Sequence, residues 1–473
     1  MFKKFCIMFL VVLMAGCRSL PIKTGGNFTE DKPSWQIDED SFITPESFRV
    51  GVLLPLSGDA AKVGQGLKQA TMLALDDMNN HNLILQFYDT QGTPEGARVA
   101  VENALNQSVK MIIGPLMSSE VEAISYQTRR RGVPVVTFST DEKVLQNHVY
   151  TLGLLVDEQV DRVIGYAAEC GRSRFALLLP DNISGMAVAK SAVRAAKKYG
   201  GRVARIAFYP PNTTDFSEIV RELTDFAQRS DMLKREKIQL QAMSNGGDKE
   251  AAAILHKMDL NDISDNTDFD AVIIPESGSR LKSAAAMFGY YDVFAPEVMF
   301  LGTSVWENTG LNKETTLNKA IYPRLSRTHS AYFNKKFQSL FGAYPNGLYA
   351  LAYDAVALSS ALARRNPHDL DNAIIHSDGF AGINGIFRFF ADGKNQHSLD
   401  IVQITPSADV VIDSAPHRFA AEMPNIQNSN LEDVAADYDN DPPLIFGKDI
   451  AEAQIGIFGR QLGFGYESSG FFY

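Results

Sequence analysis

Two patterns of hydrophobic and polar positions alternate along this chain from residue 48 onward. Residues 50–56 form a short apolar run, which is typical of a buried parallel strand, and Ser57 and Gly58 end it. Apolar positions at helical spacing follow over residues 67–78. The pattern then predicts strands at 83–88, 109–113 and 133–138, and helices at 95–106 and 120–131. Alternating strands and helices predict an α/β fold in which a parallel sheet carries helices on both faces.

A second α/β unit is predicted beyond residue 155. Its strands are expected at 174–179, 202–209, 269–275, 298–302 and 399–405, and its helices at 159–170, 186–199, 216–230 and 280–289. Further helices are expected at 345–365 and 369–376. The charged segment 231–268 is predicted to be an inserted helical segment. A hairpin is expected at residues 391–394, because Asp392-Gly393 is a strong turn signal.

The first 17 residues indicate export. A short basic start precedes an apolar core that is too short to span a bilayer, and residues 13–17, LMAGC, resemble the lipobox of bacterial lipoproteins. That resemblance implies a signal peptide at 1–17 and lipidation of Cys17, with Arg18 in the next position favouring the outer membrane. The alternative is an ordinary secretory signal that contains a cysteine. Residues 18–47, rich in Pro, Gly and polar side chains, are expected to form a flexible tether.

Composition limits the classes of partner. The chain has 473 residues, of which 45% are hydrophobic, so it can bury two cores. A net charge of -11 argues against nucleic acid or an anionic membrane surface as a partner. The chain contains three cysteines. Cys6 leaves with the signal and Cys17 is lipidated, so Cys170 has no disulfide partner and is expected to be a small, buried apolar residue.

Motifs for catalysis are incomplete. Gly64-Gln65-Gly66 lacks the third glycine of a dinucleotide fingerprint, and Ser184 does not lie in a G-x-S-x-G motif. The eight histidines are scattered without metal-ligand spacing. The sequence therefore predicts neither an enzyme, nor a metal site, nor a cofactor.

Several motifs in a fixed order resemble the type I periplasmic binding proteins of the leucine-binding kind. They are VGVLLPLSG, IIGPLMSSE, VPVVTFST, FLGTSVWEN, the helix LYALAYDAVALSSAL and the ending GINGIFRFFADGK, within residues 48–413. The resemblance implies two lobes joined by three hinge crossovers near 154–157, 302–306 and 389–392. It assigns 48–155 and 306–390 to the first lobe, and 156–305 and 391–413 to the second. Residues 414–473 remain as an acidic and aromatic C-terminal tail.

The same resemblance suggests a ligand site at the carboxyl ends of the strands. Amino-acid binders of this family hold the ligand carboxylate at positions that match Ser118, Ser119, Ser139 and Thr140, and helix N-termini with small hydroxyls do favour anions. The alternative is that these residues only cap helices. The position that holds the ligand ammonium aligns with Ser279 or Arg280, and the nearest carboxylate is Glu276. Ser57 and Asp181, which also follow predicted strands, are added to this set. The candidate ligand-binding residues are therefore Ser57, Ser118, Ser119, Ser139, Thr140, Asp181 and Glu276.

A narrower resemblance is to the penicillin-binding protein activators. The lipobox, the tether, the inserted helical segment and the GTSVWEN turn carry it. It implies an outer-membrane lipoprotein on the periplasmic face that stimulates a peptidoglycan synthase by contact. Residues 231–268 and 464–473 are candidate contact surfaces, because both fall outside the minimal two-lobe fold and aromatic residues favour interfaces; alternatively, the insertion is a solvated helical pair and the tail packs on its own domain. The alternative is the substrate-binding component of an ABC transporter for amino acids or a similar small anion.

Overall fold

The computed structural model describes residues 47–260, 267–327, 329–419, 442–448, 452–453 and 456–457. The predicted signal peptide with Cys17, the tether up to residue 46 and the aromatic run 464–473 lie outside these ranges. Within them, no helix is both long enough and apolar enough to cross a membrane.

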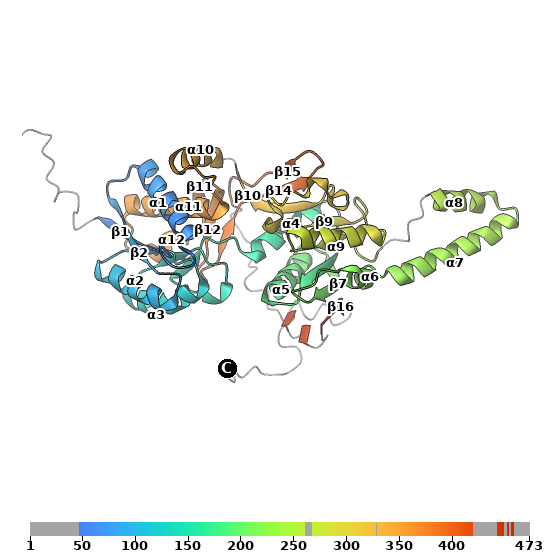
Figure 1. The fold of residues 1–473 in the computed structure, drawn as a ribbon, viewed down its shortest axis with the longest axis horizontal. Helices are drawn as coiled ribbons and strands as arrows, with labels where there is room; N and C mark the ends of the chain where they lie inside the picture. Colours follow the sequence, from blue (N-terminus) through green and yellow to red (C-terminus); the bar gives the residue numbers. More distant parts are fainter. Residues whose placement is uncertain are drawn as a thin grey trace, which may run out of the picture. The chain divides into compact units, whose positions relative to one another are not determined.

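The first sheet has five parallel strands in the order β2-β1-β3-β4-β5. One face packs against α1 and α11, whose residues share a core with Val50, Val52 and Leu54, and the other packs against α2 and α3 around Leu53. Figure 1 shows these helices on the two faces. The elements are β1 (Phe48–Leu54), α1 (Ala61–Met78), β2 (Leu83–Asp89), α2 (Pro94–Asn106), β3 (Met111–Ile113), α3 (Ser118–Arg131), β4 (Val135–Thr137), β5 (Val149–Thr151), α10 (Ser330–Phe341), α11 (Gly347–Arg365) and α12 (Leu370–Ile374).

The second sheet has eight strands in the order β15-β14-β10-β9-β8-β6-β7-β16, of which β14 and β15 run antiparallel to their neighbours. Helices α4 and α5 cover one face, and α6 and α9 cover the other. The elements are α4 (Val156–Glu169), β6 (Arg174–Pro180), α5 (Ile183–Lys198), β7 (Arg202–Tyr209), α6 (Ser217–Leu223), β8 (Ala271–Ile273), α9 (Gly278–Tyr290), β9 (Met299–Leu301), β10 (Ile321–Leu325), β14 (Leu399–Ile404), β15 (Asp409–Asp413) and β16 (Leu444–Phe446).

Residues 306–325, which end in strand β10, belong to the second α/β unit, although the sequence assigned them to the first lobe. Strand β10 pairs with β9 and β14, and Trp306 is 1% exposed within the core of the second unit. The Trp306 ring packs directly on Gly302: a Cβ atom added to Gly302 would lie 2.1 Å from the ring. Nε1 of Trp306 donates a hydrogen bond to the carbonyl of Ile274 at 3.0 Å. The chain therefore does not leave the second unit at 302–306. The second of the three connections between the lobes comes after β10.

The C-terminal segment contributes a strand that the sequence did not predict. Strand β16 pairs in parallel with β7, and Ile445, Ala453 and Ile457 enter the core beneath α4 and α5. Part of the segment predicted to be a tail therefore forms an edge strand of the second sheet.

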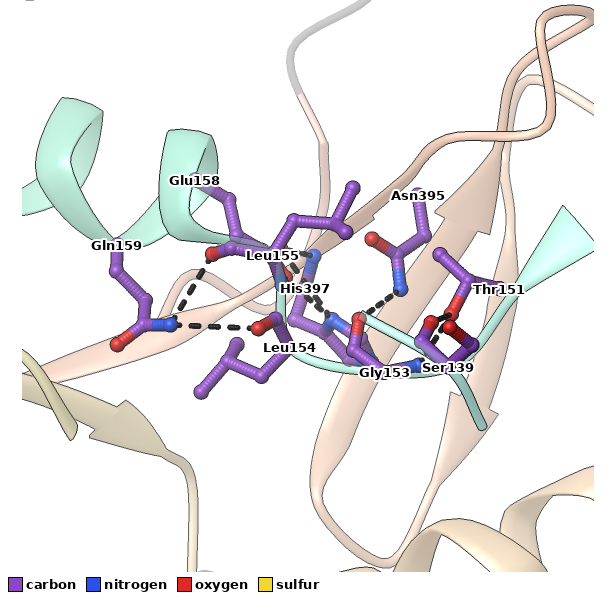
Figure 2. A network of polar contacts seen from close by, with 9 residues as sticks. All are labelled: Ser139, Thr151, Gly153, Leu154, Leu155, Glu158, Gln159, Asn395 and His397. Carbon is purple, nitrogen blue, oxygen red and sulfur yellow. Dashed lines mark hydrogen bonds and ion pairs between the residues drawn. The ribbon is translucent and has the colours of Figure 1, made fainter. Parts of the chain in front are cut away.

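Hydrogen bonds tie the first and third crossovers together (Figure 2). The amide of Asn395 donates to the carbonyl of Gly153 at 2.9 Å. The Glu158 carboxylate accepts from the backbone N–H of Leu155 at 2.9 Å and of His397 at 2.7 Å, and it lies 3.1 Å from Nδ1 of His397. The side chains of Glu158 and His397 are 8% and 2% exposed. The two residues lie at the hinge end of α4 and in a small antiparallel sheet formed by β11 (Phe380–Gly382), β12 (Gly385–Phe389) and β13 (Asn395–His397).

The inserted segment is a helical hairpin, as the sequence predicts, but it begins earlier. Helix α7 (Phe226–Asn245) packs along α8 (Lys249–Leu260) (Figure 1). Arg229 fixes its base by donating to the carbonyls of Thr224 at 3.1 Å and Tyr291 at 3.3 Å. Among the hairpin side chains that the structure describes, Met232, Ile238, Met243 and Ile254 are large, apolar and exposed.

The prediction that Cys170 is buried is wrong. Cys170 is exposed, because α4 ends at Glu169 and the following turn, with Gly171 at φ +83°, lies at the surface.

Candidate functional site

At the carboxyl end of β1, the hydroxyl of Ser57 is already engaged. It donates to Asp89 Oδ2 at 2.6 Å, and Asp89 Oδ1 accepts from the backbone N–H groups of Leu56 and Gln91 at 2.9 and 2.8 Å. Burial opposes ionisation of Asp89, but these hydrogen bonds outweigh it and lower the pKa of its carboxyl group. Ser57 and Asp89 therefore hold the ends of β1 and β2 together.

Ser118 and Ser119 begin α3 and line a groove of about 340 Å³. The opposite wall contains Asp141 and Lys143, which follow β4. The N-terminus of α3 is closed by Glu120, whose carboxylate accepts from the N–H of Met117 at 2.9 Å. The groove thus presents hydroxyls and one ammonium group beside two carboxylates, those of Glu122 and Asp141.

Ser139 and Thr140 lie just before that wall and differ in exposure. Ser139 is 5% exposed and its Oγ accepts from the N–H of Asp141 at 3.2 Å, so it supports the turn, whereas Thr140 is exposed. The structure therefore brings Ser118 and Ser119 together at one groove, with Ser139 in a supporting position. Ligand binding by the four residues stays a prediction.

On the second sheet, Glu276 is paired within the protein. Its Oε2 accepts from the hydroxyl of Tyr209 at 2.9 Å and lies 3.0 Å from Nε of Arg280. The Arg280 guanidinium also lies over the Tyr209 ring at 5.5 Å. Burial, together with the charge of Glu276, raises the pKa of Tyr209, which keeps the phenol protonated as a donor.

Asp181 is paired as well, with a residue that the sequence did not single out. Its Oδ1 lies 2.6 Å from Nζ of Lys448, and its backbone N–H donates to the carbonyl of Tyr209 at 2.7 Å. The sequence around Asp181 does not indicate this partner, because Lys448 lies 267 positions from Asp181, in the segment predicted to be a C-terminal tail. Tyr209, by contrast, could have been found as the last residue of a predicted strand.

Large apolar side chains are exposed at the same ends of the strands. Ile183 at the start of α5 is 76% exposed, Val305 after β9 is 47% exposed, and Met117 before α3 is 39% exposed. The acidic candidates of the second sheet thus carry internal partners, and the exposed side chains near them include apolar as well as polar ones. Among the described residues, no cluster of His, Cys, Asp or Glu has the arrangement of a metal site.

Comparisons with known proteins concern the fold. Residues 47–227 match the model of a periplasmic binding protein family. A branched-chain amino acid ABC transporter protein from Rhodospirillum rubrum has a TM-score of 0.61 at 17% identity, over 77% of this chain and all of that chain (100%). The LpoA C-domain from Haemophilus influenzae, described as a regulator of PBP1A, has a TM-score of 0.55 at 16% identity, over 77% of this chain and 99% of that chain.

One curated protein shows a sequence match. It is an uncharacterized protein of Rickettsia prowazekii, 22% identical over 211 residues, which are 42% of this chain and 56% of the relative. The match thus spans little more than half of that relative's length.

Proposed function

We propose that this chain, whose fold is that of the type I periplasmic binding proteins as its sequence predicts, is a non-enzymatic regulator that acts by contact on a peptidoglycan synthase. The fold alone is compatible with two roles, because its structural relatives include transporter binding proteins and a regulator of a penicillin-binding protein. The choice between them rests on the residues of this chain.

The observation that carries the proposal is the internal pairing of the acidic groups on the second sheet. A receptor for free amino acids needs a carboxylate that is available to the ligand ammonium. Here Glu276 faces Arg280 and Tyr209, and Asp181 faces Lys448. A ligand amine would have to break one of these contacts before it could bind, which lowers its affinity.

The N-terminal sequence supports a place at the outer membrane. Residues 13–17 resemble a lipobox, and the 30 residues that follow would reach ~100 Å when extended. Attached through Cys17, the folded part would work in the periplasm, away from the outer-membrane surface. This placement suits contact with a synthase in the inner membrane better than delivery of a solute to an importer.

The exposed apolar side chains of the hairpin are candidate contact residues for this role. Met232, Ile238 and Met243 project from α7 and Ile254 projects from α8, each at least 42% exposed. Apolar side chains at the centre of an interface contribute most of its affinity.

A direct test measures glycan polymerisation by a purified bifunctional peptidoglycan synthase with and without the purified full chain. We expect stimulation by the wild type, and about tenfold weaker half-maximal stimulation by an Ile238→Glu/Met243→Glu variant, because a buried charge would disfavour the contact. Val99→Glu is the matched control, since Val99 is 62% exposed on α2, far from the hairpin in sequence. Absence of stimulation and of a complex with wild-type protein would reject the proposal.

The second candidate, a solute receptor, is favoured by the groove at Ser118 and Ser119. We expect no saturable heat when free amino acids are titrated into the wild-type chain. Tight binding of one amino acid, weakened by Ser118→Ala, would favour the receptor instead, since losing a hydrogen bond to a charged group costs about 1.5–3 kcal/mol.

A further inference from the structure

Strand β16 delivers a lysine to the edge of the second sheet where its parallel strands end. It pairs with β7 through Leu444↔Arg205, Ile445↔Ile206 and Phe446↔Ala207, and therefore runs in the same direction as β6 and β7. Asp181 directly follows β6, and Lys448 follows β16 by two residues. The carboxyl ends of neighbouring parallel strands meet at one edge of the sheet, which is where ligands bind in such folds.

The backbone at this point is shaped to bring the lysine inward. Gly447 has φ +72°, and a Cβ there would lie 1.8 Å from the carbonyl oxygen of Phe208. No other residue type fits this close approach. Lys448 then lies over the Phe208 ring at 5.3 Å, with its side chain 12% exposed and its Nζ 2.6 Å from Asp181.

The two ion pairs of this edge differ in origin. Arg280 is four residues from Glu276 on the same local turn, so that pair forms wherever α9 forms. Lys448 comes from 267 positions away, and its Nζ also lies 3.6 Å from Oε1 of Glu452. The ammonium partner of Asp181 is thus supplied by the C-terminal segment and not by the turn that carries Asp181.

We infer that Lys448 is a built-in ligand of the second sheet, an ammonium group carried by the C-terminal segment that occupies an amine-binding position at Asp181. The inference rests on the proposed function and deepens it, because it names the contact that keeps the position closed to soluble amines. When Lys448 is removed, the position at Asp181 should bind primary alkylammonium ions, because they offer the same three N–H donors as lysine.

Chemical rescue tests the inference. In the full chain, Lys448→Ala leaves Asp181 without its ammonium partner, and n-propylammonium chloride is the probe. We expect a concentration at about ten times the dissociation constant to raise Tm of this variant by ~1–2 °C. Sodium chloride at equal ionic strength, or tetramethylammonium chloride, which has no N–H donor, should not reproduce the increase.

Two controls define the site. The wild type and the Lys448→Ala/Asp181→Asn double variant should show no response to propylammonium beyond that to sodium chloride. An equal response in the double variant, or no response in folded Lys448→Ala, would overturn the inference.

A second measurement does not depend on the folding of Lys448→Ala. Reductive methylation of the full chain, followed by mass spectrometry, reports the reactivity of the Lys448 amine. We expect modification about tenfold faster in Asp181→Asn than in wild type, because the nearer carboxylate partner of the amine is gone and the exposed Glu452, at 3.6 Å, is left. Equal rates would also overturn the inference. A propylammonium response in a chain that fails to stimulate the synthase would retain this inference and reject the proposed function.

Discussion

Glu158→Gln is expected to lower the free energy of unfolding by about 2–5 kcal/mol. The carboxylate accepts from the N–H groups of Leu155 and His397 and faces Nδ1 of the His397 ring, with both side chains buried. A carboxylate only accepts, whereas an amide carries two N–H donors. The side-chain NH2 of glutamine would therefore face the backbone N–H of Leu155 or of His397, and no water can enter this buried site to separate the two donors.

Chemical denaturation of the full chain at constant pH measures the loss, and hydrogen exchange locates it. The amide of Leu155, of His397 or of both should exchange faster in the variant, because the single oxygen of glutamine replaces two carboxylate oxygens. Glu169→Gln is the matched control, since Glu169 is exposed at the other end of the same helix. Unchanged exchange at both amides would show that Glu158 does not hold the two crossovers together.

The stability of the protein is expected to fall as the pH rises from about 4 to about 7 because of Asp354. This residue of α11 is 1% exposed and accepts from the N–H of Ile383 at 2.7 Å and from the amide of Asn384 at 3.3 Å. Burial raises its pKa to about 7 from a usual value of 3.8, although the hydrogen bonds and His397 act in the opposite direction.

The sign of the effect follows from proton binding. Between these two pKa values the folded protein retains a proton that the unfolded chain releases, so each increase in pH favours unfolding. The contribution is fully present below the unfolded pKa and is lost as the pH passes the folded one. The difference of about 3 pKa units corresponds to at most ~4 kcal/mol.

Urea denaturation at pH 5 and pH 8 measures this loss. Asp354→Asn should reduce the difference between the two pH values, because the amide does not titrate and still has an oxygen for Ile383. Asp378→Asn is the control, since the Asp378 side chain is 88% exposed. A wild type that is equally stable at both pH values, or an Asp354→Asn variant with the full difference, would contradict the assignment to Asp354.

Local patterns in the sequence were sufficient for most of the parallel core. Strand β7 was predicted with both ends correct, because its apolar run is bounded by Gly201 and Pro210. Strand β10 was missed because IYPRL is short and contains a proline that is unusual within a sheet. Strand β16 was missed because three apolar residues in an acidic, polar stretch give no local signal, and only pairing with β7 defines them.

The partners of the candidate site residues could not be predicted for a related reason. The sequence placed Asp181 and Glu276 after the strands that the structure shows as β6 and β8, but it could not show which charges they face. Glu276 meets an arginine within the same turn, which spacing alone can suggest. Asp181 meets a lysine that only the tertiary fold brings near. Burial of Cys170 was predicted from residue type, whereas its position after the last turn of α4 determines its exposure.

The position of β16 has a consequence for how the protein matures. The second sheet is assembled from stretches spread over the chain, and its last strand is contributed by residues 444–446. The N-terminal part of the chain is synthesised first, so the edge of β7 that faces away from β6 stays open until the C-terminal residues arrive. Exposed apolar sheet edges template aggregation. Chaperones that hold such edges are therefore expected to matter in this interval, and a protease that removes β16 would expose the same edge of β7 again.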